Sequence, residues 1–322
     1  MKLLSMRVEN RNLAGMAIGE EALEVSGFLR LRGGEIAASQ TALGPPTRDG
    51  VPDTLKDALD LYLLGGDYLQ AIVFQINGDS GLAGECREAG LLRPLSEIQL
   101  NPPVIAPGKI LAAGLNYAAH AAEQNKKPPE SPLIFSKNVT ALVGHGDPIR
   151  LPLISDQVDY EAELAFVIGK QARSVSADRA LDYVAGYTIM NDVTARDLQS
   201  SEWQWARAKG LDTFGPCGPW LVTRDEISDP HSLGIELRVN GEIRQRSNTD
   251  DLIFKIPDLI EFISQDLTLM PGDIISTGTP SGVGIYHQPP VFLKAGDEVE
   301  IRIEKIGALR NAVAGAGGRA RG

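Results

Sequence analysis

Cysteine is almost absent from this chain of 322 residues, which contains only Cys86 and Cys217. Two cysteines cannot build a disulfide framework, and neither lies in a Cys-x-x-Cys pair or in another spacing typical of a thiolate metal site. So few thiols fit a reducing compartment, and we therefore expect a cytoplasmic protein.

Long hydrophobic runs are also lacking. No apolar stretch approaches the roughly 20 residues that cross a bilayer. The apolar stretch at the N-terminus is interrupted by Ser5 and Arg7 before a signal-peptide core can form. We therefore expect no membrane span and no export by a signal peptide.

An excess of basic charge is missing as well. The chain has 31 Lys and Arg against 42 Asp and Glu, a net charge of −11, and a pI near 4.9. This charge opposes binding to phosphate backbones, so nucleic acid is excluded as an expected partner. The hydrophobic share of 43% is typical of a globular protein, and a small molecule is the expected partner.

A proline-rich segment divides the chain. Residues 100–108 carry three prolines, a composition that stops regular structure and commonly marks a boundary. We predict a small α/β domain over residues 1–104, a β-rich catalytic domain with peripheral helices over residues 105–311, and a flexible Gly-rich tail over residues 312–322. The predicted fold class is α+β and β-rich.

Apolar periodicity and turn residues place the elements. The predicted strands cover residues 16–18, 28–31, 109–113, 163–168, 185–190, 237–239, 273–276 and 298–303. The predicted helices cover residues 54–64, 116–125, 194–207 and 252–265. The third helix begins with the capping-box pattern Thr194-x-x-Asp197, and Asn240-Gly241 predicts a two-residue hairpin turn.

The most informative stretch is Asp159-Tyr-Glu-Ala-Glu163, which leads into an apolar strand. Side chains alternate along a strand, so Glu161 and Glu163 share one face. If the strand is central, two buried carboxylates need a cation between them. Oxygen ligands favour Mg²⁺, Mn²⁺ or Ca²⁺ over Zn²⁺. An edge strand with a wet acidic face explains the same pattern.

Asp192 supplies a third carboxylate at the end of the following predicted strand. A junction between a strand and a helix often displays a ligand or a catalytic group. Glu161, Glu163 and Asp192 can therefore form a cation site whose remaining positions are open to water or substrate. A turn aspartate that caps the next helix is the alternative explanation.

His120 and Glu123 are three residues apart on a predicted helix, so they share a face. The carboxylate can hold one imidazole nitrogen while the other faces a water, which is the geometry of a general-base dyad. A surface pair on a helix explains the same spacing.

A loop rich in Thr, Ser and Gly follows the strand that begins at Asp273 and runs to Gly284. Its backbone N–H groups and hydroxyls suit a carboxylate or an oxyanion, although a tight turn explains its glycines. The P-loop, Gly-x-Gly-x-x-Gly and Gly-x-Ser-x-Gly patterns are absent.

The order of five motifs resembles the fumarylacetoacetate hydrolase family, in its bacterial two-domain form, over about residues 109–311. The motifs are Gly114-Leu-Asn-Tyr-Ala-Ala-His120, Asp159-Tyr-Glu-Ala-Glu163, Asn191-Asp-Val-Thr-Ala-Arg-Asp-Leu-Gln199, Lys209-Gly-Leu-Asp-Thr-Phe-Gly-Pro216 and Thr277-Gly-Thr-Pro-Ser-Gly-Val-Gly284. The resemblance implies a catalytic domain built as a mixed β-roll or β-sandwich, and a homodimer.

The resemblance also implies roles for single residues. Mg²⁺ or Mn²⁺, replaceable by Ca²⁺ in a crystal, would bind Glu161, Glu163 and Asp192. His120 and Glu123 would activate water on a mobile lid. The resemblance alone implies three further roles: Lys209 would stabilise developing negative charge, and Gln199 and Thr279 would hold substrate oxygens.

The substrates implied by the resemblance are short 2-oxo acids. We rank first a hydrolase that cleaves a C–C bond of a 2,4-dioxo acid, such as an acylpyruvate or a fumarylacetoacetate-like compound, through an enolate that the metal stabilises, in aromatic or sugar-acid catabolism. The alternative is a decarboxylase, isomerase or dehydratase of oxaloacetate, a hydroxymuconate-type diene or a 2-keto-3-deoxy sugar acid. A catalytically silent metal-binding module is the remaining alternative.

Overall fold

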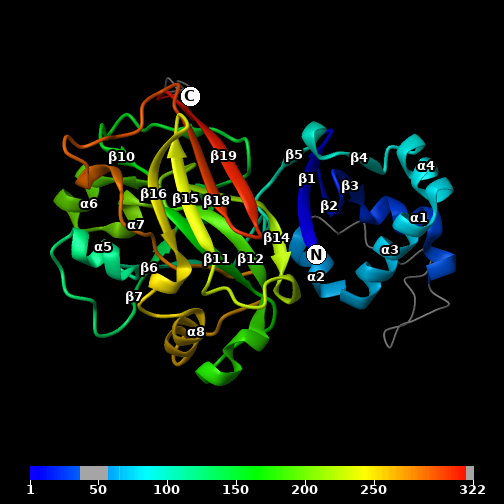
Figure 1. Cartoon of the computed structure of the whole chain (residues 1–322), viewed down its shortest axis with the longest axis horizontal. Helices are drawn as coiled ribbons and strands as arrows, with labels where there is room; N and C mark the ends of the chain where they lie inside the picture. Colours follow the sequence, from blue (N-terminus) through cyan, green and yellow to red (C-terminus); the bar gives the residue numbers. More distant parts are fainter. Residues whose placement is uncertain (37–56, 65, 317–322) are drawn as a thin grey trace, which may run out of the picture.

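Two β-sheets dominate the computed structural model, which describes residues 1–36, 57–64 and 66–316 (Figure 1). The large sheet has the order β4-β3-β2-β1-β14-β12-β11-β17-β6-β7, with β5 beside β1 and β8 beside β14. Its strands are β1 (Lys2–Val8), β2 (Arg11–Ile18), β3 (Glu21–Glu24), β4 (Leu92–Pro94), β5 (Gln99–Leu100), β6 (Ile110–Gly114), β7 (Leu133–Lys137), β8 (Leu142–Val143), β11 (Ala162–Ile168), β12 (Val184–Asn191), β14 (Gly215–Thr223) and β17 (Ile274–Ser276).

The second sheet has the order β16-β15-β18-β19-β9, and a separate pair joins β10 to β13. These strands are β9 (Ile149–Arg150), β10 (Val158–Asp159), β13 (Thr194–Ala195), β15 (Gly234–Val239), β16 (Glu242–Asn248), β18 (Glu298–Ile303) and β19 (Gly307–Ala314). The second sheet packs on β11, β12 and β14 of the large sheet. Buried Leu164, Phe166, Leu237 and Ile301 belong to the shared core.

Helices lie at the periphery of the sheets (Figure 1). The α-helices are α1 (Val25–Ile36), α2 (Ala58–Leu64), α3 (Gly66–Gly78), α4 (Ser80–Glu88), α5 (Ala118–Glu123), α6 (Arg196–Glu202), α7 (Trp205–Ala208) and α8 (Ile256–Ser264). The 3₁₀ turns are η1 (Leu95–Glu97), η2 (Val139–Ala141), η3 (Ala177–Tyr183), η4 (Arg224–Glu226), η5 (Thr249–Asp251) and η6 (Gly284–Tyr286). No helix of the described residues is long and apolar enough to cross a membrane.

The N-terminal region extends the large sheet. Strand β1 pairs antiparallel with β14, with Leu3 opposite Leu221. Buried Leu3 and Phe28 share a core with Met190 and Cys217 of the later region. The division at residues 104 and 105 therefore separates two regions of sequence that share a sheet, and we keep it as a proposal.

The β-rich α+β fold is confirmed. The predicted strands over residues 109–113, 163–168, 185–190 and 298–303 correspond to β6, β11, β12 and β18. Those over 16–18 and 237–239 lie in β2 and β15, and that over 273–276 overlaps β17, which begins at Ile274. The hairpin at Asn240-Gly241 joins β15 to β16 with both residues at positive φ, as this two-residue turn requires. The predicted helix over residues 54–64 is α2, and residues 54–56 lie outside the described residues.

The strand predicted over residues 28–31 is wrong, because this segment lies inside helix α1. Val25, Phe28 and Leu29 are fully or almost fully buried, and their spacing of three and four residues is helical. Leu31, in contrast, is 46% exposed on the outer face. Burial of this apolar face against β2 and β3 decides the structure.

The helix predicted over residues 194–207 is divided, and its capping box is wrong. Thr194 belongs to β13, and helix α6 begins after Ala195 without a side-chain cap. The Thr194 hydroxyl donates to the Asp192 carbonyl instead, and Asp197 accepts from Ser155 at 2.6 Å. Trp203 adopts a left-handed conformation with φ of 57°, which separates α6 from α7.

The tail predicted from residue 312 is wrong at its start. Strand β19 continues to Ala314, with Asn311 and Val313 buried. Buried and exposed residues alternate there, which fits a strand that lies between β18 and β9 and has one face on the core. Residues 317–322 of the predicted tail lie outside the described residues.

His231 links the second sheet to α8 and gives a testable pH dependence. Its Nε2 accepts a hydrogen bond from the Ile256 N–H at 3.1 Å, at the start of α8. Burial, and then the nearby Lys255 charge, lower the pKa of His231 below its ordinary value of 6.5. The folded protein therefore binds fewer protons than the unfolded chain in this range, and stability falls as the pH falls below about 6.5.

We expect His231→Gln, which does not titrate, to lose less unfolding free energy than wild type between pH 7.5 and 5.5, by at most about 1.4 kcal/mol per pH unit. Urea denaturation at each pH measures this difference. Parallel pH profiles for the two proteins would contradict the role of His231.

Candidate active site

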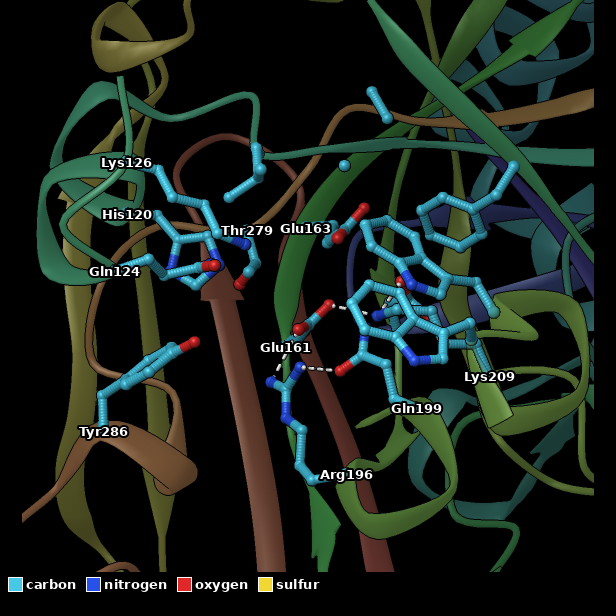
Figure 2. A pocket seen from close by; sticks show the side chains of 17 residues that line it. His120, Gln124, Lys126, Glu161, Glu163, Arg196, Gln199, Lys209, Thr279 and Tyr286 are labelled. Atoms are coloured by element: carbon cyan, nitrogen blue, oxygen red, sulfur yellow. Dashed lines mark hydrogen bonds and ion pairs between the residues drawn. The ribbon is translucent and has the colours of Figure 1, made fainter. Parts of the chain in front are cut away.

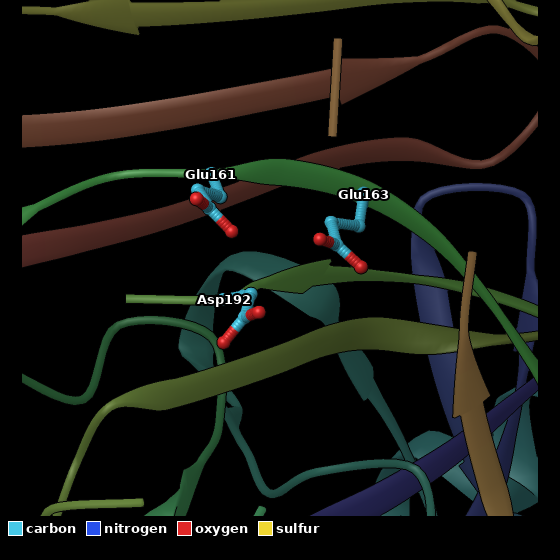
Figure 3. Close-up of side chains that lie close together, drawn as sticks. All are labelled: Glu161, Glu163 and Asp192. Atoms are coloured by element: carbon cyan, nitrogen blue, oxygen red, sulfur yellow. The ribbon is translucent and has the colours of Figure 1, made fainter. Parts of the chain in front are cut away.

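Three carboxylates meet where β11 begins and β12 ends (Figure 3). The antiparallel register places Ala162 opposite Asn191, so Glu161 and Asp192 flank the same end of the strand pair. The exposed fractions of Glu161, Glu163 and Asp192 are 5%, 2% and 0%. One oxygen of each lies within 4.8 Å of the other two. The structure thus brings together the three predicted ligands. Their burial excludes the alternative explanation, an edge strand whose acidic face is exposed to solvent.

Three cationic side chains surround two of these carboxylates. Lys209 Nζ donates to Glu161 and to Asp192, each at 2.8 Å, and to the Thr194 hydroxyl at 2.7 Å. Arg196 donates to Glu161 at 2.7 Å, and Lys137 donates to Asp192 at 2.5 Å. These pairs compensate the desolvation of the buried charges.

The electrostatic environment differs between Glu161 and Glu163. Burial favours a raised pKa at Glu161, but Lys209 and Arg196 outweigh it and lower the pKa to about 2. Burial, together with the negative charges of Asp192 and Glu161, raises the pKa of Glu163. Glu163 accepts hydrogen bonds from the Ser276 hydroxyl and from the Gly278 N–H, so neutral donors hold it.

The donor set fits a hard divalent cation. Its potential ligands are carboxylate oxygens, which Mg²⁺ and Mn²⁺ prefer, and it contains no thiolate or imidazole. Among the described residues Glu163 has neutral hydrogen-bond donors and makes no ion pair, so a positive ion beside it would relieve its repulsion from Asp192 and Glu161.

The His120–Glu123 pair forms a hydrogen-bonded dyad on α5. His120 Nδ1 lies 2.9 Å from Glu123 Oε2, and the other Glu123 oxygen accepts from the Gly282 N–H at 2.8 Å. His120 is 5% exposed, so the pair is not a wet surface pair. Gln124 Nε2 lies 2.8 Å from His120 Nε2. An amide donor at Nε2 leaves Nδ1 to donate to Glu123, which is the tautomer of a general base.

The dyad and the carboxylates face one cavity of about 180 Å³ (Figure 2). The predicted site residues that line it are His120, Glu161, Glu163, Asp192, Gln199, Lys209 and Thr279. Glu123 is the only predicted site residue that does not line the cavity. It is hydrogen-bonded to His120, whose imidazole it orients. The cavity is also lined by Ala113, Gly114, Leu115, Gln124, Lys126, Phe135, Arg196, Trp203, Trp205 and Tyr286.

Gln199 and Thr279 each keep a donor for a ligand. The Gln199 side-chain oxygen accepts from Arg196 at 3.1 Å, which leaves its NH₂ group for other partners. The Thr279 hydroxyl accepts from Gln245 at 2.8 Å, which leaves its own O–H to donate. Both donors suit a carboxylate or carbonyl oxygen.

Sequence reasoning missed several residues of the site. Lys137 lies at the end of β7, far from the acidic strand in sequence, and no local pattern distinguishes it from other lysines. Arg196 lies within the quoted motif around Asp192, so that motif contained a signal for it. Phe135 and Trp205, whose rings are 5.4 Å apart, form an aromatic wall that only the fold brings together.

Removal of one carboxylate tests the cation site. We expect Glu163→Gln to weaken Mn²⁺ and Mg²⁺ binding by about 100-fold, because a neutral amide replaces an anionic ligand. Isothermal titration calorimetry measures the affinities, and Glu236→Gln, at a surface ion pair, is the matched control. Equal affinity of Glu163→Gln and wild type would contradict the assignment.

Comparisons with known proteins identify the family of this chain. The family model "Fumarylacetoacetate (FAA) hydrolase C-terminal" matches residues 109–314. The mitochondrial oxaloacetate tautomerase fahd2 of Xenopus laevis is 51% identical over 220 residues, which cover 68% of this chain and 69% of that protein.

Two solved structures are similar over almost the whole chain. A 5-carboxymethyl-2-hydroxymuconate delta-isomerase of Mycobacterium smegmatis is 35% identical with a TM-score of 0.69, covering 99% of this chain and 100% of that one. A fumarylacetoacetate hydrolase of Exiguobacterium antarcticum is 32% identical with a TM-score of 0.76, covering 98% and 99%. This chain belongs to the fumarylacetoacetate hydrolase superfamily, which is a family of enzymes.

Proposed function

We propose that this protein is a divalent-metal-dependent tautomerase that interconverts the enol and keto forms of oxaloacetate or of a closely similar 2-oxo acid. In the enol-to-keto direction the C2 hydroxyl loses a proton, C3 gains one, and the C2=C3 double bond becomes a C2=O bond. The observation that carries the proposal is the His120–Glu123 dyad, which faces the three buried carboxylates across one cavity.

The names of similar proteins support this chemistry over the hydrolysis that we ranked first from the sequence. The Xenopus laevis relative is named an oxaloacetate tautomerase, and the Mycobacterium smegmatis structure is named an isomerase. Tautomerisation and isomerisation of this kind both move a proton at the carbon next to a 2-oxo group. The proposal therefore selects the isomerase alternative for the same site.

A divalent ion would be held by Glu161, Glu163 and Asp192, and when bound it would act as a Lewis acid toward the 2-oxo group. Gln199 and Thr279 would orient the substrate through their remaining donors. Mg²⁺ and Mn²⁺ both suit these ligands.

His120 is the proton carrier in this proposal. Glu123 fixes the Nδ1–H tautomer, so the lone pair of Nε2 can take a proton from C3 in the keto-to-enol direction. In the enol-to-keto direction the C2 hydroxyl proton leaves to water, and protonated Nε2 delivers a proton to C3. Gln124 donates to this nitrogen in the structure and must move aside when the substrate binds. His120 and Gln124 are on the same short helix and its end, so a small movement of that segment changes both positions.

Lys209 acts by its charge rather than as a base. Its three Nζ donors bind Glu161, Asp192 and Thr194, and its pKa is raised because these carboxylates outweigh the effect of burial. An ammonium group that is protonated and fully paired cannot accept a proton. Lys209 therefore holds the carboxylates in place and lowers the energy of negative charge near them.

Cleavage of a C–C bond in a 2,4-dioxo acid is the second candidate function. The aromatic wall of Phe135 and Trp205 favours it, because an apolar surface suits the acyl chain of an acylpyruvate. The same dyad can deprotonate a water that attacks the distal carbonyl. The name of the Exiguobacterium antarcticum structure adds support.

Three further expectations accompany the proposal. The few cysteines favour a cytoplasmic location, the family resemblance favours a homodimer, and the ligand set favours Mg²⁺ or Mn²⁺. Fractionation of the native host, sedimentation of the purified protein and metal analysis test them in turn.

Substitution of His120 tests the mechanism. We expect His120→Asn to lower enol-to-keto turnover of oxaloacetate by about 10²- to 10⁴-fold, the range of general acid–base catalysis, while metal affinity stays within about twofold of wild type. Decay of the enol absorbance measures turnover, and Glu130→Gln, at an exposed position in the segment after α5, is the control. Full activity of His120→Asn would contradict the role of the dyad. If the wild-type protein instead splits an acylpyruvate into pyruvate and an acid, the second candidate replaces the first.

A further inference from the structure

Lys126 differs from the other cations that line the cavity. Lys209 and Arg196 are each bound to two or more groups of the protein. Within the described part of the chain, the Lys126 ammonium has no hydrogen bond or ion pair. Lys126 is exposed to solvent at the cavity, and its charge is available to a ligand.

The end of α5 fixes the position of Lys126 beside the dyad. Asn125 adopts the left-handed conformation with φ of 53°. The Asn125 N–H donates to the Ala122 carbonyl, and the Lys126 N–H donates to the Ala121 carbonyl, each at 2.9 Å. This pair of bonds is a Schellman motif, which reverses the chain after a helix. The reversal brings Lys126 to the same side of the cavity as His120 and Gln124 (Figure 2).

The charges around the carboxylates suggest what Lys126 binds. With a divalent ion bound, which would favour the ionised form of Glu163, the carboxylates of Asp159, Glu161, Glu163 and Asp192 would carry four negative charges, and Lys137, Arg196 and Lys209 carry three positive ones. A divalent ion would leave one positive charge, which matches one substrate carboxylate. Glu123, which is hydrogen-bonded to the cavity-lining His120, adds negative charge on this side and opposes binding of a further anion. A second carboxylate therefore needs another cation, and Lys126 is placed to supply it.

We infer that Lys126 binds the distal carboxylate of the substrate and makes the enzyme selective for 2-oxo dicarboxylates over 2-oxo monocarboxylates. This inference rests on the proposed function for the reacting end of the substrate, and it names the class of its other end. Because Lys126 is exposed, its attraction for a dianion is screened by salt. The selectivity therefore decreases as ionic strength increases.

Lys126→Gln tests this inference, with Lys127→Gln as the matched control. Lys127 is the next residue, is also exposed, and does not line the cavity. The probes for binding are 2-oxoglutarate and 2-oxopentanoate, which have the same chain length and differ only in the distal carboxylate. Calorimetry with the Mg²⁺-loaded protein needs no turnover, so it is independent of the reaction. The probes for activity are oxaloacetate and its 4-methyl ester.

We expect Lys126→Gln to weaken 2-oxoglutarate binding about tenfold at low salt and to change 2-oxopentanoate binding less than about twofold. For oxaloacetate, KM should rise while kcat changes little, and the methyl ester should be unaffected. Lys127→Gln should match wild type with every probe.

Two results would overturn the inference. One is a wild-type protein that does not prefer the dicarboxylate, and the other is an equal loss for both probes in Lys126→Gln. Loss of dicarboxylate binding alone, in a protein that shows no tautomerase activity, would keep the role of Lys126 and reject the proposed reaction.

Discussion

The site depends on the burial of like charges at one end of two adjacent strands. Glu161, Glu163 and Asp192 are almost completely removed from water, with oxygens within 4.8 Å. Such an arrangement is costly without positive charge beside it, because both desolvation and mutual repulsion oppose ionisation. Lys137, Arg196 and Lys209 supply part of that charge from three different elements. The carboxylates therefore require cationic side chains from the end of β7, the start of α6 and the residue after α7.

The fold meets this constraint by placing β11 and β12 in the middle of the large sheet. Strand β12 lies between β11 and β14, and β14 in turn carries the N-terminal strands through β1. The second sheet packs on one face of these strands, and a continuous apolar core lies between the two sheets. Central strands hold the carboxylates, whereas His120, Gln124 and Lys126 lie on a short helix and the turn after it. Under the proposed function, the strands would hold the ion, and the helix with its following turn would meet the substrate.

The parts of this arrangement that follow from local sequence patterns could be predicted from the sequence. Glu161 and Glu163 share a face because of strand periodicity, and His120 and Glu123 share one because of helical periodicity. Lys209, Gln199 and Thr279 came only from family resemblance, since single residues in loops and short helices have no periodic signal. Lys137 was missed because the pairing of β7 with β6 is a long-range contact. The capping role of Thr194 was wrong because Lys209 and the Asp192 carbonyl bind its hydroxyl.

The most direct test of the account is deuterium incorporation at C3 of oxaloacetate in D₂O, followed by NMR with the Mg²⁺-loaded protein. A proton carrier on one side of the substrate predicts labelling of a single prochiral position, faster than the uncatalysed exchange, with oxaloacetate otherwise intact. Pyruvate formation without stereospecific labelling would contradict the account, because it would show that the site breaks a C–C bond rather than moving a proton.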